Sequence, residues 1–319
     1  MTYTLVATAK NEAPFLLEWV AYHRLIGFDN IILYQNDSDD YTDKILRTLK
    51  RMGVVSYFYN EAKRGAHQVR AYRRASRQDS FRQADWVIAL DLDEFLVINT
   101  GNGHLDDLVA GFDGSDVVML NWRRFGNGGA VEISEDLVTQ RYFMTEREDR
   151  IINQLTPFKT LFKPTQYTRC GIHKPNGPLV PEDQIRLCNG SGLTEGAFEL
   201  RGFRCTDPQK RRLAQINHYV VKDAASFVLK SYRGAAHQSD RNMGKHYWNK
   251  HNFNDQRDES LTRMAPAIEA EMAALNEASD GRLMRLRAKA IMLHQSRFEQ
   301  LMTEKGFAEL YDYCATHPA

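Results

Sequence analysis

Apolar and polar residues follow two different periods along the first part of the chain. Short runs rich in β-branched and aromatic residues predict strands, and stripes that repeat every three to four positions predict helices. The predicted strands cover residues 2–8, 31–34, 54–59, 86–90 and 117–121, and the predicted helices cover residues 15–26, 45–52, 68–83 and 105–112. Because the two kinds of element alternate, the pattern predicts an α/β fold with a doubly wound, mostly parallel sheet.

The pattern changes after this alternating part. Residues 125–215 combine short apolar runs with turn sequences, and long loops inside a compact protein are commonly binding loops or lids. Helical stripes return from residue 261 onward. The expected organisation is one domain over residues 1–235, with halves at 1–122 and 123–235, and a helical extension over 236–319. This extension is expected to brace the domain or to form a homodimer contact.

Charge balance and hydrophobicity limit the classes of protein. Lys plus Arg total 42 and Asp plus Glu total 41, so the overall balance does not indicate a nucleic-acid-binding surface. Hydrophobic residues make up 43% of the 319, but no apolar stretch reaches the roughly 18 residues that a membrane span requires. The four cysteines are far apart and form no C-x-x-C pair, which fits neither a zinc site nor a disulfide framework. We therefore expect a cytoplasmic protein with reduced thiols, no membrane span and no nucleic-acid partner.

An acidic cluster follows the predicted strand at 86–90. It reads Asp91-Leu92-Asp93-Glu94, and alternate residues of an extended chain point the same way, so Asp91 and Asp93 are expected to aim at one object. Ligands of open α/β sheets bind off the carboxyl ends of the strands, and paired carboxylates suit a divalent cation such as Mg²⁺ or Mn²⁺. A solvated turn, or Asp93 capping a helix, is the alternative.

Two further polar loops follow the first two predicted strands. Lys10-Asn11-Glu12 comes after the first strand, and Asn36-Asp37-Ser38-Asp39-Asp40 comes after the second. Taken alone, each is as well explained by helix capping or by a turn. Together with the acidic cluster, however, they fall on the same edge of the predicted sheet, which predicts a ligand site there.

These motifs, in this order, resemble the GT-A glycosyltransferases of the family 2 and family 92 type. The matching residues are Lys10-Asn11-Glu12, Glu18-Trp19, His23, Gly27, Asn36 to Asp40 and Asp91 to Phe95, followed more weakly by Trp122 to Gly126, Lys159, Pro164, Asn217-His218-Tyr219, Phe227, Lys230, Arg233 and Gly234. The resemblance covers about residues 1 to 234. It implies a nucleotide-sugar-binding first half and an acceptor-binding second half.

The resemblance also implies roles for individual residues on the donor side. Asp93 would bind the metal, Asp91 would bind the ribose, the metal or a metal-bound water, and His218 would complete the metal shell, in which an imidazole favours Mn²⁺ over Mg²⁺. The expected donor-binding residues are Lys10, Asn11, Glu12, Asp37, Asp91, Lys230 and Arg233, and we add Arg64 and Gln68 from a basic segment before a helix. Structural hydrogen bonding by His218, and ion pairing by Glu12, remain open alternatives.

The acceptor side is less marked in the sequence. An inverting transfer needs a base within reach of the acceptor hydroxyl, and Glu182-Asp183 is the first candidate and His173 its competitor. Each is equally compatible with a turn or capping role. Trp122 and Phe125 are candidates for an apolar floor under a sugar ring, with core packing as the alternative.

The sequence therefore predicts a metal-dependent, inverting glycosyltransferase that moves a hexose from a UDP-linked donor to a glycan acceptor. A nucleotidyltransferase that makes sugar nucleotides is the second enzyme hypothesis, but no glycine-rich phosphate loop follows the first strand. A catalytically silent carbohydrate-binding protein of the same fold is the third.

Overall fold

The computed structural model describes residues 1–61, 67–112, 114–148, 157–194, 198–199, 204–205, 211–233 and 243–317. The strands are β1 (Tyr3–Ala9), β2 (Asn30–Gln35), β3 (Ser56–Tyr59), β4 (Trp86–Ala89), β5 (Glu94–Ile98), β6 (Val117–Arg124), β7 (Met144–Thr145), β8 (Phe158–Phe162), β9 (Tyr167–Arg169), β10 (Asn176–Pro178), β11 (Leu187–Asn189), β12 (Phe198–Glu199), β13 (Arg204–Cys205), β14 (Ala214–His218) and β15 (Gln256–Arg257). The helices are α1 (Ala13–Leu25), α2 (Thr42–Arg51), α3 (His67–Ala75), α4 (Asp79–Arg82), α5 (Leu105–Ala110), α6 (Val138–Arg141), α7 (Ala224–Arg233), α8 (Lys245–His251), α9 (Ala265–Glu277), α10 (Arg282–Leu301) and α11 (Lys305–Thr316), with short 3-10 helices η1 (Glu182–Gln184) and η3 (Thr262–Met264).

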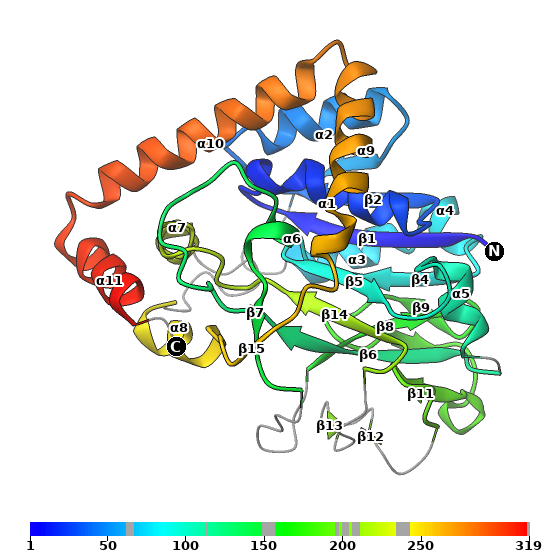
Figure 1. Ribbon diagram of the computed structural model, residues 1–319. Helices are drawn as coiled ribbons and strands as arrows, with labels where there is room; N and C mark the ends of the chain where they lie inside the picture. Colours follow the sequence, from blue (N-terminus) through cyan, green and yellow to red (C-terminus); the bar gives the residue numbers. More distant parts are fainter. Residues whose placement is uncertain are drawn as a thin grey trace.

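One nine-stranded sheet organises the chain (Figure 1). Its strand order is β3-β2-β1-β4-β8-β6-β14-β5, and β11 also pairs with β6. The first four strands of this order are mutually parallel, and β14 and β11 run parallel to β6, whereas β8 and β5 are antiparallel to their neighbours. The predicted α/β fold with a mostly parallel sheet is therefore confirmed.

Both faces of the sheet are covered, as a doubly wound fold requires. Alternate residues of β1 belong to different hydrophobic clusters: Leu5 and Ala7 pack on the side of α1, and Val6 packs on the side of α3. In Figure 1, α1, α2, α9 and α10 lie together on one side of the sheet. The strands read as nearly continuous apolar runs because both of their faces are buried.

The C-terminal helices pack onto the sheet domain. Leu283 and Leu286 of α10 lie in the same hydrophobic cluster as α1 and the sheet. Arg287, also on α10, is buried and donates to the carbonyl oxygens of Pro14 at 3.0 Å and Glu135 at 2.7 Å. The predicted helical extension thus forms part of the wall around α1.

Three local features differ from the sequence-based expectation. The predicted helix at 68–83 is two helices, α3 and α4, separated by a turn at Ser76–Gln78. The acidic cluster is followed by β5, a strand that was not predicted. Its first residue, Glu94, had been counted with the acidic cluster. The irregular segment 125–215 contributes β8 and β11 to the main sheet.

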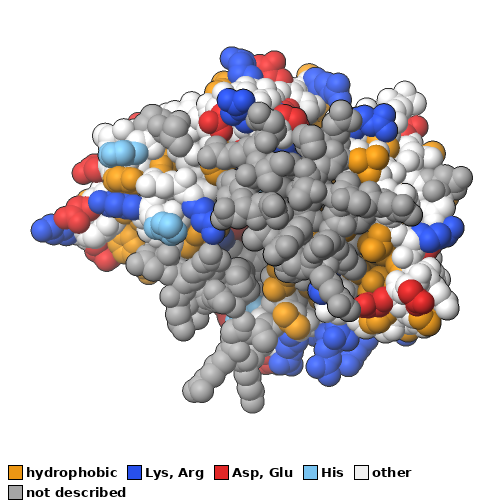
Figure 2. All heavy atoms as spheres, turned by 90° about the horizontal axis from the view of Figure 1, so that it is seen from below, with side chains coloured by type: hydrophobic (Ala, Val, Ile, Leu, Met, Phe, Trp, Pro, Cys, Tyr) orange, Lys and Arg blue, Asp and Glu red, His pale blue; other side chains and the backbone are white. Residues whose placement is uncertain are grey.

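The face drawn in Figure 2 carries side chains of both charges. Figure 2 views the molecule from below, and on this face Lys and Arg side chains stand at several separate places around the margin, with Asp and Glu side chains among them. Among the described residues, no helix has the length and apolar character needed to cross a bilayer.

Candidate donor-binding and catalytic site

Asp91 and Asp93 lie in the tight turn that joins β4 to β5. The amide of Glu94 donates to the carbonyl of Asp91 at 3.0 Å, and the amide of Asp91 donates to the Glu94 carboxylate at 2.9 Å. The amide of Tyr219, just after β14, donates to the carbonyl of Asp93 at 2.8 Å. These bonds fix the turn and bring the end of β14 to it.

Asp91 is held by two side chains from outside the turn. Lys159 of β8 donates to its Oδ2 at 2.9 Å, and Gln68 of α3 donates to its Oδ1 at 2.7 Å. Lys159 is 1% exposed and lies 3.2 Å from the buried Glu94 carboxylate. Burial raises the pKa of Glu94 well above its ordinary value, although the charge of Lys159 acts in the opposite direction. For Lys159, burial acts to lower the pKa, but the nearby Asp91 and Glu94 carboxylates raise it overall. Lys159 is therefore the cation that compensates the negative charge of the turn in the protein interior.

Asp93 is held by a different pair of residues. Lys230 of α7 donates to Oδ2 at 2.8 Å, and Nε2 of His218 lies 3.6 Å from Oδ1. Burial acts to raise the pKa of Asp93, but Lys230 and His218 lower it well below its ordinary value. Burial lowers the pKa of His218, which Asp93 only partly offsets. The two carboxylates, which we expected to converge on one ion, are thus each engaged by a different lysine.

Asp93 and His218 have the spacing of two ligands of one cation. Their 3.6 Å separation is too long for a hydrogen bond, and two ligands of an ion bound at about 2.1 Å lie roughly 3 to 3.5 Å apart. No group of three His, Cys, Asp or Glu side chains suited to a metal occurs among the described residues. The residues therefore fit an ion held by Asp93 and His218 whose remaining ligands come from a bound substrate and water.

The loops after β1 and β2 are fastened to each other. The amide of Asn11 donates to Oγ of Ser38 at 3.1 Å, and the amide of Asp39 donates to Oδ1 of Asn11 at 2.9 Å. Asn11 and Asp37 have positive φ values of 53° and 47°, a conformation that Asn and Asp adopt more readily than other non-glycine residues. Tyr59 of β3 donates to Asp37 at 2.6 Å. The two predicted loops therefore meet at one edge of the sheet.

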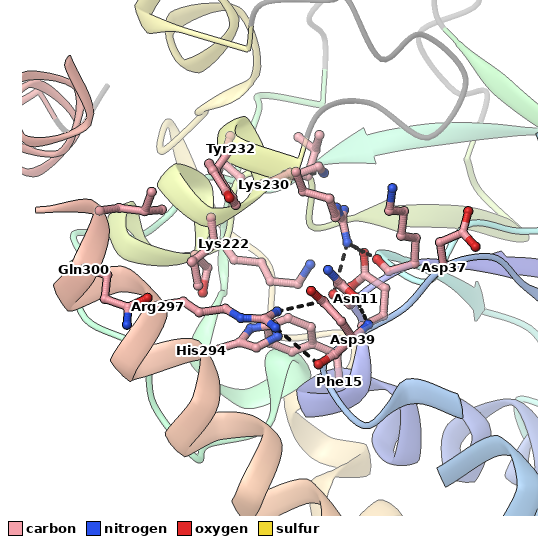
Figure 3. Close-up of a pocket in the computed structure, with 18 of the residues that line it drawn as sticks. Asn11, Phe15, Asp37, Asp39, Lys222, Lys230, Tyr232, His294, Arg297 and Gln300 are labelled. Atoms are coloured by element: carbon pink, nitrogen blue, oxygen red, sulfur yellow. Dashed lines mark hydrogen bonds and ion pairs between the residues drawn. The ribbon is translucent and has the colours of Figure 1, made fainter. Parts of the chain in front are cut away.

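A cavity of about 580 Å³ opens beside these loops (Figure 3). Arg233 donates to the carbonyl oxygens of Lys10 and Asn11 and pairs with Glu12 at 2.6 Å, and Lys230 links the cavity to Asp93. The lining side chains come from the loops after β1 and β2, from α7 with the residues before it, and from α10; they include Lys10, Asn11, Glu12, Phe15, Asp37, Asp39, Lys222, Lys230, Arg233, His294, Arg297 and Gln300. The structure thus brings together the predicted donor-binding residues Lys10, Asn11, Glu12, Asp37, Lys230 and Arg233.

The two residues predicted to form an aromatic floor lie in different surroundings. Trp122 is half-buried, and its ring lies 4.2 Å from the His218 ring and 5.4 Å from the His173 ring, measured between centroids. Phe125 is 1% exposed and packs against Tyr219 at 4.6 Å in the main hydrophobic core. Phe125 therefore belongs to the core packing, and its assignment to a sugar-binding floor is corrected.

The candidate bases lie in different places. His173 is beside Trp122, its Nδ1 lies 2.9 Å from the carbonyl oxygen of Phe158, and burial lowers its pKa to about 4. Glu182 and Asp183 are exposed on η1, which precedes β11. The first residue of β11 pairs with Val117 at the amino end of β6, whereas Trp122 and His218 lie toward its carboxyl end, so this carboxylate pair is away from the site. Arg64 lies outside the described residues.

Some residues of the site were not predicted from the sequence. Lys159 was noted only as a weak match, and neither Lys222 nor the α10 residues His294 and Arg297 were considered. His294 lies 3.0 Å from Asp40, and Arg297 donates to Asp39 at 2.9 Å, so two side chains of α10 are hydrogen-bonded to the loop after β2. The available signal was a histidine and an arginine one helical turn apart, which is common on solvated helices.

Comparison with known proteins identifies the family. A model of glycosyltransferase family 92 matches residues 6–184, more than half of the chain. The chain therefore belongs to glycosyltransferase family 92.

The relatives and solved structures are distant. A family 92 protein of Oryza sativa subsp. japonica is 29% identical over 138 residues, covering 42% of this chain and 23% of its own length. A family 92 protein of Ricinus communis is 26% identical over 252 residues, covering 74% and 39%. The chain thus spans less than half the length of these curated relatives.

The chain is also similar, with low TM-scores, to two solved structures. S. aureus TarS 1-349 in complex with UDP is 16% identical, with a TM-score of 0.35 over 52% of this chain and 48% of that one. Glucosyl-3-phosphoglycerate synthase from Mycobacterium tuberculosis, solved with Mn²⁺, UDP and glucosyl-3-phosphoglycerate, is 18% identical, with a TM-score of 0.26 over 38% and 44%.

Proposed function

We propose that this protein transfers a hexose from a UDP-linked donor to a glycan acceptor, with inversion at the anomeric carbon and assistance from a divalent cation. The observation that carries the proposal is the convergence of the loops after β1, β2 and β4 on one sheet edge, where Lys230 joins the cavity to Asp93. Ligands of open α/β sheets bind at this edge. Family membership supplies the reaction class.

Asn11 and Asp37 support a uracil-type base as the part of the donor that they contact. Uracil presents one N–H donor flanked by two carbonyl acceptors. Asp37 keeps one carboxylate oxygen beyond its bond from Tyr59, and this oxygen can accept from the N–H. The side-chain carbonyl oxygen of Asn11 accepts from the amide of Asp39, which leaves the side-chain nitrogen of Asn11 to donate to a carbonyl of the base.

Positive charge at the site supports a diphosphate leaving group. In the reaction the acceptor oxygen forms a bond to the anomeric carbon, the bond from that carbon to the diphosphate oxygen breaks, and the nucleoside diphosphate leaves with the bonding electrons. Lys230 and Arg233 are partly buried cations of the cavity wall, where they can stabilise this charge. A divalent ion held by Asp93 and His218 would add Lewis-acid stabilisation of the same oxygens.

His173 is the candidate for the base that accepts the proton of the acceptor hydroxyl. A carbonyl oxygen only accepts, so Nδ1 of His173 donates to Phe158, and in the neutral ring Nε2 is the basic nitrogen. Its lowered pKa keeps the ring neutral at pH 7. Its position beside Trp122, the remaining candidate for the sugar floor, favours it over Glu182 and Asp183.

The decisive experiment measures UDP release from a panel of UDP- and GDP-linked hexoses, with and without Mn²⁺, together with calorimetric binding of UDP. We expect Mn²⁺-dependent UDP binding and slow hydrolysis of one UDP-hexose. Glycan binding without any nucleotide binding would support a carbohydrate-binding protein instead. Formation of UDP-sugar from UTP and a sugar 1-phosphate would support a nucleotidyltransferase.

A further inference from the structure

Lys222 is a buried cation at the cavity wall. The residue is 5% exposed and lines the cavity, and Figure 3 shows its side chain extending into it. Among the described residues its ammonium has neither a hydrogen-bond acceptor nor a carboxylate at ion-pair distance. It lies over the face of the Phe15 ring, 4.4 Å from the centroid. A buried charge without a partner is costly, so this position favours a ligand that brings negative charge.

Three neighbouring cations, Lys230, Arg233 and Arg297, have carboxylate partners. Lys230 pairs with Asp93 at 2.8 Å, and Arg233 pairs with Glu12 at 2.6 Å. On the opposite wall, Arg297 of α10 pairs with Asp39 at 2.9 Å. Lys222 therefore differs from these three cations, because it is more deeply buried and its charge is left for a bound group.

The backbone at Lys222 is also unusual. Its φ is 56°, in the left-handed region, which residues other than Gly, Asn and Asp seldom adopt. Burial lowers the pKa of Lys222, with Glu12 acting in the opposite direction. Both features are costs for the folded protein, and a bound anion offsets the second one.

We propose that the cavity between the loop after β1, the start of α7 and α10 binds a phosphate group through the ammonium of Lys222. A phosphate oxygen accepts charge-assisted hydrogen bonds from ammonium groups, and a cavity of about 580 Å³ has ample room for a diphosphate. The phosphate comes either from the donor's diphosphate or from a phosphate-bearing acceptor. Only this choice of source rests on the proposed function.

The test is calorimetric titration of the whole chain with inorganic pyrophosphate. Lys222→Met removes the charge and keeps the length of the side chain, and we expect it to weaken pyrophosphate binding at least tenfold. Lys222→Arg, which restores a cation, should bind within about threefold of the wild type. The matched control is Lys289→Met, an exposed lysine of α10, which should bind as the wild type does. Unchanged binding by Lys222→Met, or no pyrophosphate binding by the wild type, overturns the proposal.

Thermal unfolding of each variant separates a folding defect from a binding defect. If Lys222→Met does not fold, Lys222→Asn replaces it, because Asn adopts the left-handed backbone more readily. Repeating the titration with saturating UDP identifies the source of the phosphate. If UDP displaces pyrophosphate, and Lys222→Met leaves uridine binding unchanged, the phosphate is that of the donor. If pyrophosphate still binds in the presence of UDP, the phosphate is that of the acceptor. A protein that binds pyrophosphate through Lys222 but transfers no sugar would refute the proposed function and leave this inference standing.

Discussion

Nε2 of His218, at the end of β14, lies 3.6 Å from Oδ1 of Asp93, in the turn between β4 and β5. The sheet sets this distance. In the β14–β5 register His218 is opposite Glu94, the residue after Asp93, and the amide of Tyr219 is bonded to the Asp93 carbonyl. The pairing of β14 with β5 therefore fixes the His218 imidazole beside the acidic turn, although the two residues are far apart in the sequence.

Replacing Asp93 tests its role in transfer. We expect Asp93→Asn to reduce the rate of UDP release by about a hundredfold or more, because a carboxylate that stabilises developing charge is lost. The rate is measured under single-turnover conditions with the donor identified in the panel. Asp79→Asn, an exposed acidic residue of α4, is the control. Wild-type turnover by Asp93→Asn would refute the assignment.

Replacing His218 tests the metal. We expect chelation with EDTA to abolish UDP binding by the wild type, and Mn²⁺ to restore it. His218→Gln should weaken Mn²⁺ binding about tenfold or more and should affect Mg²⁺ less, because imidazole is the ligand that distinguishes the two ions. Electron paramagnetic resonance of free Mn²⁺ gives the binding constant independently of activity. His246→Gln, at an exposed position on α8, is the control, and equal Mn²⁺ affinities for the two variants would exclude His218 as a ligand.

Lys159 is expected to be a major determinant of stability. Lys159→Met leaves the Asp91 and Glu94 carboxylates without their buried cation, and breaking such a buried pair costs about 3–5 kcal/mol. Urea unfolding measures the loss. Lys163→Met removes a partly exposed cation from Asp116 and should cost about 1 kcal/mol or less. Similar losses for both variants would show that burial of Lys159 does not determine its contribution.

His23 predicts a loss of stability in mild acid. It is fully buried with Nδ1 bonded to the Trp19 carbonyl, and burial lowers its pKa to about 3. The unfolded chain takes up a proton near pH 6.5 and the folded chain does not, so this contribution is complete above pH 6.5 and declines as the pH falls toward 3. Between pH 6.5 and 5.0 the decline is about 1.6 kcal/mol.

A phenylalanine at this position isolates the effect. His23→Phe cannot titrate, so its free energy of unfolding should fall less between pH 7.5 and pH 5.0 than that of the wild type, by about 2 kcal/mol. Urea titrations at the two pH values give both numbers. His246→Phe, exposed on α8, should follow the wild type. A His23→Phe protein with the wild-type pH profile would contradict the prediction.

The alternation of strands and helices was predictable because it depends on local periodicity. The short apolar run before Asp91 and the helical stripe from Phe15 identify their own elements without knowledge of their partners. The rule that ligands bind at the carboxyl ends of strands then placed Asn11, Asp37 and Asp93 on one edge. For these residues the sequence contained enough information.

The remaining parts of the site depend on contacts between distant segments. Lys159 reaches Asp91 only because β8 lies between β4 and β6, and no local pattern reveals that insertion. Phe125 was assigned to the site although it faces the core, because the sequence does not show where β6 ends and which way its next side chain points. The separate lysine partners of Asp91 and Asp93 were likewise invisible before the fold was known.

The contacts of His294 and Arg297 on α10 with the loop after β2 bear on how the cavity could change between related proteins. His294 and Arg297 lie well beyond residues 6–184, which match the family model, yet they hold Asp40 and Asp39 beside the cavity. One wall of the pocket therefore comes from a segment outside the part of the chain that the family model matches. Exchanging this helix between homologues would be a route to new substrate preferences on an unchanged catalytic framework.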